Sequence, residues 1–297
     1  MLFSIIILTF NEEKTIGKLL KKLDAMSKKF NREIIVIDSE STDETLKIAK
    51  KLSKKIKNMK VYEIKKKDFN HGKTRNFGVS LAKGELVCFV SGDALPKAKR
   101  SFDYFLEDLR LDKKVVAVYT KDTPYKDTPF IQKLEVLCRY EQFDKHISKK
   151  GVLIQNLEKP FVPFTNENKF LWYVLSNVFA CYKRRFLVNH PFPKTNYGED
   201  VLMGKFIIKN GFTKIYDRRC EVTHSHKYTL HEYYKRQKED FSLRYSKLKL
   251  GGKGLILCKI KKIIALNIPF TKKSYYLIQL LFYYLIKLVA FAHAKVF

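Results

Sequence analysis

The sequence predicts an α/β fold built on a largely parallel sheet that is flanked by helices. Over the first hundred residues, short runs rich in β-branched residues alternate with stretches whose apolar residues recur at helical spacing. The strand-like runs are almost continuously apolar, as expected of strands buried on both faces. Strands separated by helices pair in parallel through right-handed crossovers, so this alternation predicts helices on both faces of the sheet.

Four strands and three helices are predicted in this first part of the chain. The strands are "LFSIIIL", "EIIVID", "VYEI" and "ELVCFV", at residues 2–8, 33–38, 61–64 and 85–90. The helices are expected over 13–26, after a capping box formed by Ser41 and Glu44, and over much of 72–83.

The pattern becomes less regular after residue 96. A fifth strand is expected over 115–120 and a helix over 131–143. Residues 151–170 are expected to form a loop because prolines interrupt them. A strand-like run with a basic pair follows at 175–187, and 196–212 has the apolar spacing of an amphipathic helix.

Polar residues follow three of the predicted strands. Thr9 and Glu12 come after the first strand, Asp38 ends the second, and Asp93 follows the fourth. In open parallel sheets, ligands bind outside the carboxyl ends of the strands, so these side chains are expected to meet at one crevice. A lone acid at a strand end is more often a turn former, but several on one edge favour a ligand site.

Phosphate-binding glycine loops are absent from the sequence. It contains neither G-x-G-x-x-G after the first strand nor G-x-x-x-x-G-K-[ST] anywhere, which argues against dinucleotide-binding and P-loop domains. Phosphate would therefore need a metal ion or basic side chains. Arg75, beside His71 and Lys73, is suited to bidentate phosphate contact, with a solvated basic helix start as the alternative.

Two later groups of residues have the chemistry of a site. Glu199 and Asp200 begin a predicted helix, where compensation of the helix dipole is sufficient to explain acids. His224 and His226 are two positions apart and would face the same side of a strand, as a ligand pair would. Scattered surface histidines are the alternative.

The composition limits the class of protein. The 59 Lys and Arg residues against 30 Asp and Glu residues give a net charge of +29. Such an excess attracts nucleic acid, acidic lipid headgroups or phosphorylated substrates, although solvated lysine faces explain it equally well. Five widely spaced cysteines without a C-x-x-C pair argue against a disulfide framework or a zinc ribbon and for a reducing compartment. The N-terminal stretch lacks the basic leader of a signal peptide.

The last segment, 274–297, is apolar and aromatic, with interruptions at Gln279, Lys287 and His293. Its length is sufficient to span a bilayer, but the interruptions and the tyrosines favour an interfacial helix. Lysines beside apolar residues over 259–274 favour contact with a membrane surface. The alternative is a helical appendage that packs on the core or on a second subunit.

Taken in order, these stretches resemble glycosyltransferase family 2, which has the GT-A fold, and more narrowly its rhamnosyltransferase-like subgroup. The resemblance covers about residues 3–240. It is carried by "SIIILTFNEE", "IIVIDSESTDET", "FNHGKTRNFG", "FVSGDALP", "LSNVFACYKRRF", "YGEDVLMGKFIIKNGF" and "VTHSHKYT". The fold implied is a Rossmann-like, mixed but largely parallel sheet flanked by helices, with a C-terminal helical extension.

The resemblance implies that a nucleotide-sugar donor binds at the first three motifs. Thr9 and Glu12 would lie on the loop that receives the nucleotide. Asp38 would contact the base or the ribose, and Arg75 would lie near the base or the diphosphate.

The resemblance also implies a divalent metal ion, Mg²⁺ or Mn²⁺. Asp93 matches the last acid of the family's D-x-D motif, and it would also contact the donor. Ser91 stands where the motif has its first acid, so His224 or His226 would help Asp93 to hold the ion.

On the acceptor side, Asp200 matches the base that activates the sugar hydroxyl, and Glu199 and Asn177 accompany it. One base and one metal ion, without an enzyme nucleophile, imply single displacement with inversion at the anomeric carbon. The sugar, with rhamnose as the candidate, would pass to a saccharide or lipid-linked acceptor during surface polysaccharide synthesis.

The expected organisation is a catalytic domain at 1–230, with a nucleotide-binding half at about 1–96 and an acceptor half at about 97–230. A helical, membrane-contacting segment at 231–297 follows. We expect a cytoplasmic protein that is peripheral on the inner face of the cell membrane, in contact with anionic lipid and not with nucleic acid; the sequence leaves the oligomeric state open.

Two other classes of function compete with this reading. The charge of +29 is compatible with a nucleic-acid-binding protein, but no binding motif accompanies the charge and the basic residues are spread along the chain. Strand-end aspartates are compatible with a phosphotransfer or phosphatase domain, but the D-x-D-x-T type of nucleophile site is absent from the sequence after Asp38 and Asp93.

Overall fold

The first part of the chain has the predicted alternation of strands and helices. The structure is a computed structural model, and it describes residues 2–243 and 255–295. Its first elements are β1 (Leu2–Thr9), α1 (Ile16–Ser27), β2 (Asn31–Asp38), α2 (Thr45–Ser53), β3 (Met59–Glu63), the short 3-10 helix η1 (Lys66–Asp68), α3 (His71–Leu81) and β4 (Leu86–Ser91). β1 pairs in parallel with β2 and β4, and β2 pairs in parallel with β3, which confirms the predicted topology.

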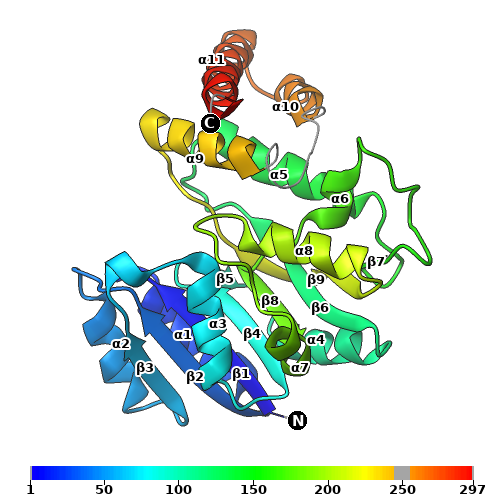
Figure 1. Ribbon diagram of the computed structural model, residues 1–297. Helices are drawn as coiled ribbons and strands as arrows, with labels where there is room; N and C mark the ends of the chain where they lie inside the picture. Colours follow the sequence, from blue (N-terminus) through cyan, green and yellow to red (C-terminus); the bar gives the residue numbers. More distant parts are fainter. Residues whose placement is uncertain (1, 244–254, 296–297) are drawn as a thin grey trace.

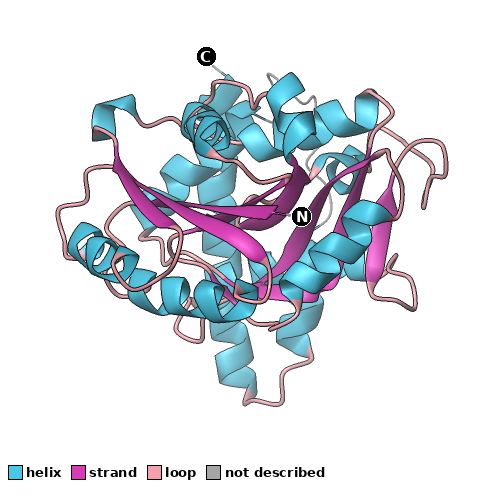
Figure 2. Cartoon of the chain, turned by 90° about the horizontal axis from the view of Figure 1, so that it is seen from below, coloured by secondary structure: helices cyan, strands magenta, loops and turns pink. Residues whose placement is uncertain are grey.

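The second part adds antiparallel strands to this sheet. Its elements are β5 (Leu95–Pro96), α4 (Ser101–Arg110), β6 (Val115–Thr123), α5 (Phe130–Asp144), β7 (Val152–Gln155), α6 (Lys169–Tyr173), β8 (Phe179–Lys183), α7 (Arg184–Asn189), α8 (Glu199–Lys209) and β9 (Thr213–Thr223). Within the described residues, nine strands form one sheet in the order β3-β2-β1-β4-β8-β6-β9-β5, with β7 beside β9. Because β8 runs antiparallel to both β4 and β6, the sheet is mixed, as predicted. Figure 2 shows helices on both faces of the twisted sheet.

Two local predictions are wrong. Residues 152–155 lie in the expected loop but form β7, which pairs antiparallel with β9; the partner strand supplies its hydrogen bonds, so local composition does not reveal it. Ser41 does not cap α2, because the N-cap is Glu44 and its side chain makes no capping bond.

The apolar residues of β1 show how the strands are fixed in place. Phe3, Ile5 and Ile7 pack into the layer that contains α1, α2 and α4, whereas Ile6 packs on the other face against Val79 of α3. Successive side chains of a strand point to opposite faces, so a strand covered on both sides is apolar throughout. This two-sided burial holds the carboxyl ends of β1 and β4 rigidly side by side.

Three helices form the C-terminal extension, namely α9 (Leu230–Leu243), α10 (Leu255–Ile264) and α11 (Phe270–Lys295). They lie beside α5, at the opposite end of the molecule from β1 to β3 (Figure 1). The predicted helical extension is therefore confirmed for 230–243 and 255–295. The remainder of the predicted segment, 244–254 and 296–297, lies outside the described residues.

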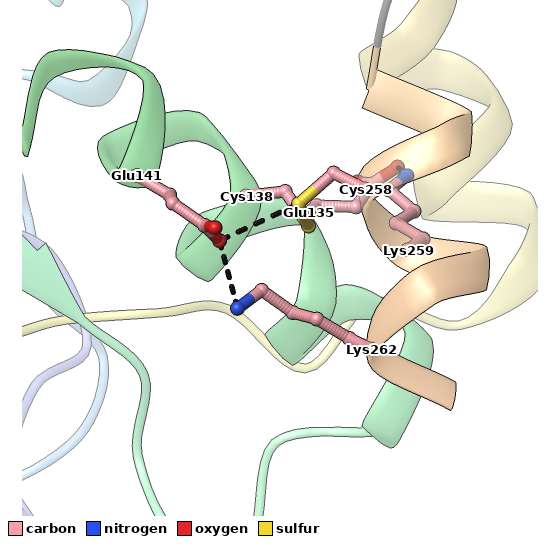
Figure 3. The surroundings of a disulfide bond; sticks show 6 residues. All are labelled: Glu135, Cys138, Glu141, Cys258, Lys259 and Lys262. Carbon is pink, nitrogen blue, oxygen red and sulfur yellow. Dashed lines mark hydrogen bonds and ion pairs between the residues drawn. A yellow bond between two sulfur atoms is a disulfide. The ribbon is translucent and has the colours of Figure 1, made fainter. Parts of the chain in front are cut away.

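Within the described residues, one disulfide ties this extension to α5. Cys138 of α5 is bonded to Cys258 of α10 (Figure 3). Cys88, Cys181 and Cys220 are free and buried, but the bond corrects the expectation for the other two cysteines. They are 120 positions apart in the sequence, so their spacing carried no sign of the pairing.

Candidate active site

A cavity of about 320 Å³ lies where the predicted site residues meet. Residues from the ends of β1 and β4, the start of α3, the start of α8 and the segment after β9 line it. Of the predicted site residues, the cavity brings together Thr9, Glu12, Arg75, Asp93, Glu199, Asp200, His224 and His226. Asp38 and Asn177 do not line it.

The loops after β1 and β4 pack tightly against each other. The Thr15 hydroxyl donates hydrogen bonds to the Gly92 carbonyl, at 3.1 Å, and to the Glu12 carboxylate, at 3.2 Å. A Cβ atom at Gly92 would lie 2.7 Å from Thr9 Oγ1 and 3.2 Å from Glu12 Cγ. Glycine is therefore needed at Gly92, which explains why the residue before Asp93 has no side chain.

Thr9 ends β1 with its hydroxyl at the cavity. It is 4% exposed, and its Oγ1 has no hydrogen-bond partner among the described residues. A buried hydroxyl without a partner costs free energy, so a bound molecule that supplies a partner would be favoured here.

Asp93, His224 and His226 form a cluster with the donor atoms of a metal site. Asp93 Oδ2 lies 3.3 Å from His224 Nε2 and 3.8 Å from His226 Nδ1. The three ligand atoms all lie within 4.8 Å of one another. Ligands of an octahedral ion lie roughly 3 Å apart, so a small closure of the cluster would seat a cation.

The charges around Asp93 favour its ionised form. Burial opposes ionisation, but His224 and His226 hold the pKa of Asp93 below its ordinary value. Burial likewise opposes charge on His224, yet Asp93 and Asp122 raise its pKa. Burial and the neighbouring His224 lower the pKa of His226 to about 4, so this imidazole is neutral and free to ligate.

Glu12 is a second carboxylate on the same side of the cavity. Burial, with a further contribution from Asp93, raises the pKa of Glu12 to about 7. A cation in the Asp93 cluster would relieve this repulsion, which agrees with a site built for positive charge.

Asp38 is fully buried and holds a turn together. Its carboxylate accepts bonds from the Ser41 backbone N–H, at 2.9 Å, and from the Ser41 hydroxyl, at 2.6 Å. This is the role that Ser41 plays in place of capping α2. The neighbouring Ser39 lines the cavity instead, so a contact between Asp38 and a base or ribose stays a prediction.

Arg75 is engaged in a buried ion pair. Its NH1 lies 2.8 Å from Glu199 Oε1, and the two side chains are 8% and 5% exposed. Arg75 Nε, however, has no partner among the described residues. The guanidinium is thus anchored on one side by Glu199 and still has a donor to offer a ligand.

Asn177 connects Glu199 and Asp200 from beneath the cavity. Its Nδ2 donates to Glu199 Oε1 and its backbone N–H donates to Asp200 Oδ2, both at 3.4 Å. Tyr182 fixes the orientation of the Asn177 amide by donating to its Oδ1 at 2.6 Å. Asn177 is therefore placed to orient the two acids rather than to contact a ligand in the cavity.

Asp200 has the protonation behaviour of a base. Burial and the adjacent charge of Glu199 raise the pKa of Asp200 to about 7, whereas Arg75 overcomes burial and keeps the pKa of Glu199 below its ordinary value. A carboxylate that binds a proton near neutral pH is suited to general base catalysis. Gly198, at φ +73°, permits the sharp entry into α8 that places Asp200 at the cavity.

The comparisons with known proteins agree with this arrangement. The sequence pattern of glycosyl transferase family 2 matches residues 4–185, which is more than half of the chain. The chain belongs to this family. Within it, the chain resembles the O-antigen rhamnosyltransferases, as predicted. It is 32% identical over 223 residues to the O-antigen chain rhamnosyltransferase RfbN of Salmonella typhimurium, covering 72% of this chain and 64% of RfbN.

A second rhamnosyltransferase and several solved structures show the same relationship. The O-antigen chain rhamnosyltransferase WbaN of Salmonella anatum is 31% identical over 208 residues, covering 69% of this chain and 60% of WbaN. The present chain therefore spans less than two thirds of the length of either relative. The mannosyltransferase PcManGT of Pyrobaculum calidifontis, solved with GDP-Man and Mn²⁺, superposes with a TM-score of 0.61 at 17% identity over 99% of this chain and 86% of that chain.

The TarS protein of S. aureus, solved in complex with UDP-GlcNAc, superposes with a TM-score of 0.54 at 20% identity, covering 95% of this chain and 72% of that chain. The fold of this family 2 member is accordingly the GT-A fold, as predicted.

A second cavity, of about 250 Å³, lies on the other side of Asp200. Asp200, Tyr197, His224, His226 and Arg236 line both cavities. Sequence reasoning missed several polar residues of this cavity. Among them are Asp122 of β6, Gln132 and Arg139 of α5, and Tyr233, Arg236 and Asp240 of α9.

Three of the missed residues have notable surroundings. Arg236 lies over the Tyr197 ring, at 3.8 Å from its centroid. Asp122 is buried behind His224, with Oδ2 at 3.9 Å from His224 Nδ1. Arg139 lines the second cavity; burial opposes its charge, but Tyr140 and Tyr197, followed by Asp240 and Asp122, raise its pKa. Each of these residues is isolated in the sequence, so no motif marked it.

Proposed function

We propose that this protein transfers a sugar, with rhamnose as the first candidate, from a nucleotide-diphosphate donor to a saccharide or lipid-linked saccharide acceptor, with inversion. The process would be the synthesis of a surface polysaccharide; the relatives RfbN and WbaN are named O-antigen chain rhamnosyltransferases. One observation carries the proposal. A carboxylate with a pKa of about 7, Asp200, lies at the same cavity as the aspartate–histidine cluster of Asp93.

The donor diphosphate would bind at the Asp93 side of the cavity. Asp93, His224 and His226 would hold a divalent cation, which neutralises the charge that develops on the departing diphosphate. Thr9 and Arg75 each have a hydrogen-bonding atom without a partner among the described residues, and both atoms are suited to phosphate or sugar oxygens.

The donor atoms of the cluster favour Mn²⁺ over Mg²⁺. Mg²⁺ prefers an octahedral shell of oxygen ligands, whereas this site offers one carboxylate and two imidazole nitrogens. Mn²⁺ accepts both kinds of ligand more readily. PcManGT was solved with Mn²⁺, which agrees with this choice for a GT-A fold.

Asp200 would act as the general base. A sugar hydroxyl is a weak nucleophile, so its proton must be taken as it attacks the anomeric carbon. Asp200 would accept that proton on a carboxylate that Asn177 holds in place. Attack by the acceptor itself, without an enzyme nucleophile, breaks the bond to the diphosphate in one displacement and inverts the anomeric centre.

The acceptor would occupy the second cavity. That cavity adjoins the first one, with which it shares Asp200, His224 and His226. Its guanidinium groups, Arg139 and Arg236, are suited to hydroxyls or to an anionic group on the acceptor. The residues of this cavity lie on both sides of the boundary proposed at about 230, because Tyr233 and Arg236 of α9 line it together with residues of α5.

The test is transfer with purified protein and a panel of nucleotide sugars that includes deoxythymidine-diphosphate rhamnose. Transfer or donor hydrolysis should require a divalent cation and stop with EDTA. Its rate should be higher with Mn²⁺ than with Mg²⁺. The anomeric configuration of the product, read by NMR, should be inverted. Absence of binding and hydrolysis for every donor would reject the proposal, and a retained configuration would reject the role of Asp200.

A further inference from the structure

The outward face of α11 is a continuous apolar stripe. Every third or fourth position of the helix presents a large apolar side chain to solvent, with exposed fractions from 46% to 67%. The members are Tyr275, Ile278, Leu281, Phe282, Leu285, Leu288 and Val289. On a helix these positions lie on one side. Stripes of this size on a protein surface mark a site of interaction.

The charged residue in the middle of α11 points the other way, toward the protein. Lys287, which interrupts the apolar sequence, pairs with Glu135 of α5 at 2.6 Å. His293 Nδ1 lies 2.7 Å from the Tyr234 hydroxyl of α9. A water-facing helix normally has its polar side outward and its apolar side inward, whereas along the stripe of α11 the exposed side is apolar and Lys287 faces the protein.

Helix α10 repeats this arrangement beside α11. Lys259 turns inward and pairs with the same Glu135 at 2.7 Å, whereas Leu257 and Ile264 are 64% and 57% exposed. The disulfide between Cys138 and Cys258 and the ion pair between Lys262 and Glu141, at 2.7 Å, hold α10 against α5 (Figure 3). The exposed residues of α10 and α11 together form what we call the docking face.

The charge around the docking face selects its partner. From residue 241 to 297 the sequence contains eleven Lys and Arg residues and no Asp or Glu. Lys261 and Lys272 are exposed on α10 and at the start of α11. A second copy of the chain would bring the same positive charge, whereas anionic lipid headgroups are complementary to it. Apolar side chains beside lysines are typical of helices that lie in a membrane interface.

The contacts of α11 distinguish lying on a membrane from crossing one. By length and composition alone, Phe270–Ala294 is long and apolar enough to cross a bilayer. Its inner side, however, packs on the protein. Leu280 joins a buried cluster with Ile131 and Leu134 of α5, and Tyr283 packs edge-on against Tyr233 of α9 with ring centroids 4.8 Å apart. A spanning helix would give up all of these contacts.

We propose that the docking face of α10 and α11 binds an anionic bilayer surface, with α11 lying in the plane of the interface. The helices α5 and α9 beneath it carry Arg139 and Arg236 of the second cavity. Docking would therefore bring the acceptor cavity close to the membrane and keep the donor strands β1 to β3 away from it (Figure 1). A membrane-bound, lipid-linked acceptor could then reach this cavity. That consequence alone rests on the proposed function.

The experiment is sedimentation of the full chain with vesicles of phosphatidylcholine alone or mixed with phosphatidylglycerol. The wild-type protein should sediment with the mixed vesicles, and high salt should weaken this binding. Replacing Leu281 and Leu285 together by glutamine should lower the partition coefficient by about tenfold or more, because two inserted leucines are lost. Both side chains are at least half exposed, and circular dichroism should show unchanged folding.

The matched control is the pair L111Q and V188Q. Leu111 follows α4 and Val188 lies in α7, and the two residues are 57% and 55% exposed. Neither belongs to the docking face, so their replacement should leave vesicle binding unchanged. Equal binding by the L281Q/L285Q protein would overturn the proposal, and so would equal binding to neutral vesicles. Light scattering that shows a dimer split by L281Q/L285Q, without vesicle binding, would assign the face to a second copy instead. Failure of sugar transfer with intact vesicle binding would reject the proposed function alone.

Discussion

Two carboxylates at one cavity, Asp93 and Asp200, lie in opposite electrostatic surroundings. Asp93 is flanked by two histidines, which hold its pKa below the ordinary value in spite of burial. Asp200 follows another acid, Glu199, and burial together with that neighbour raises its pKa to about 7. Titratable groups whose environments push their pKa values apart commonly divide acid, base and charge-binding roles.

The difference teaches which side of the cavity can bind a cation. Near neutral pH, Asp93 is ionised and His226 is neutral, as metal ligands must be, whereas a cation would displace the proton that Asp93 and Asp122 favour on His224. Asp200 instead exchanges a proton in the same pH range. Under the proposed function, Asp93 would lie on the leaving-group side and Asp200 on the nucleophile side, and each prediction below tests one part of that proposal.

The largest effect is expected from Asp200→Asn. The amide cannot accept the proton of the acceptor hydroxyl, so kcat should fall by about 10²–10⁴-fold. Donor affinity, measured by calorimetry in the presence of Mn²⁺, should stay within a factor of about two, because the amide has the shape of the carboxylate. Asp127→Asn, at an exposed acid that lines neither cavity, should change neither quantity. A full rate of transfer by the Asp200→Asn enzyme would mean that another group is the base.

The next largest effect is expected from Asp93→Ala. Loss of the carboxylate leaves two imidazoles to hold the cation, so the Mn²⁺ affinity should fall by at least about 100-fold, more than outer partners of a metal site usually contribute. Donor affinity should fall with it and become insensitive to EDTA. Titration of Mn²⁺ by electron paramagnetic resonance measures this without any turnover. An unchanged Mn²⁺ affinity would move the metal site away from Asp93.

The donor half of the fold could be predicted from the sequence because its signals are local. Buried parallel strands such as 2–8 and 33–38 are apolar along their length, and a polar residue marks where each one ends. Thr9, Glu12 and Asp93 were therefore recognised from their place after a strand. The geometry of an open parallel sheet then brings these positions to one edge.

The acceptor half could not be predicted to the same depth because its signals are tertiary. β7 depends on its pairing with β9, and Asp122 gains its place only because the chain returns with His224 about a hundred residues later. Arg139 and Arg236 lie on separate helices that meet at the second cavity. The inward turn of Lys287 depends on Glu135 of α5, so the sequence showed an interrupted apolar run where the structure has an uninterrupted face.

A third prediction sharpens the comparison through pH. As a base, Asp200 must be ionised, so kcat/KM should rise with pH through about 7 and be lost below it. Glu199→Gln removes a neighbouring negative charge and leaves Arg75 positive, and both changes lower the pKa of Asp200. The acid limb of the profile should therefore move to lower pH.

The same substitution carries a cost in stability. Arg75 would lose its buried, charged partner. Breaking a buried ion pair in this way lowers the free energy of unfolding by about 3–5 kcal/mol. Denaturant unfolding measures this and shows whether the protein used for the pH profile is folded. If the acid limb of the folded Glu199→Gln enzyme stays at the same pH, the charge of Glu199 does not control the pKa of Asp200.

The smallest effect is expected from Asp122→Asn, and it tests how the Asp93 side is organised. Asp122 is 6% exposed, its Oδ2 lies 3.9 Å from His224 Nδ1, and Ser176 donates to the same oxygen at 3.5 Å. A carboxylate behind a metal-binding histidine fixes the orientation of the ring and makes its nitrogen a better ligand, and its loss typically weakens the metal site by 10–100-fold. Because Asp122 only approaches His224, we expect the lower end, about tenfold in Mn²⁺ affinity, with kcat at saturating Mn²⁺ nearly unchanged. A fall in kcat that saturating Mn²⁺ does not restore would instead connect Asp122 to the second cavity, which it also lines.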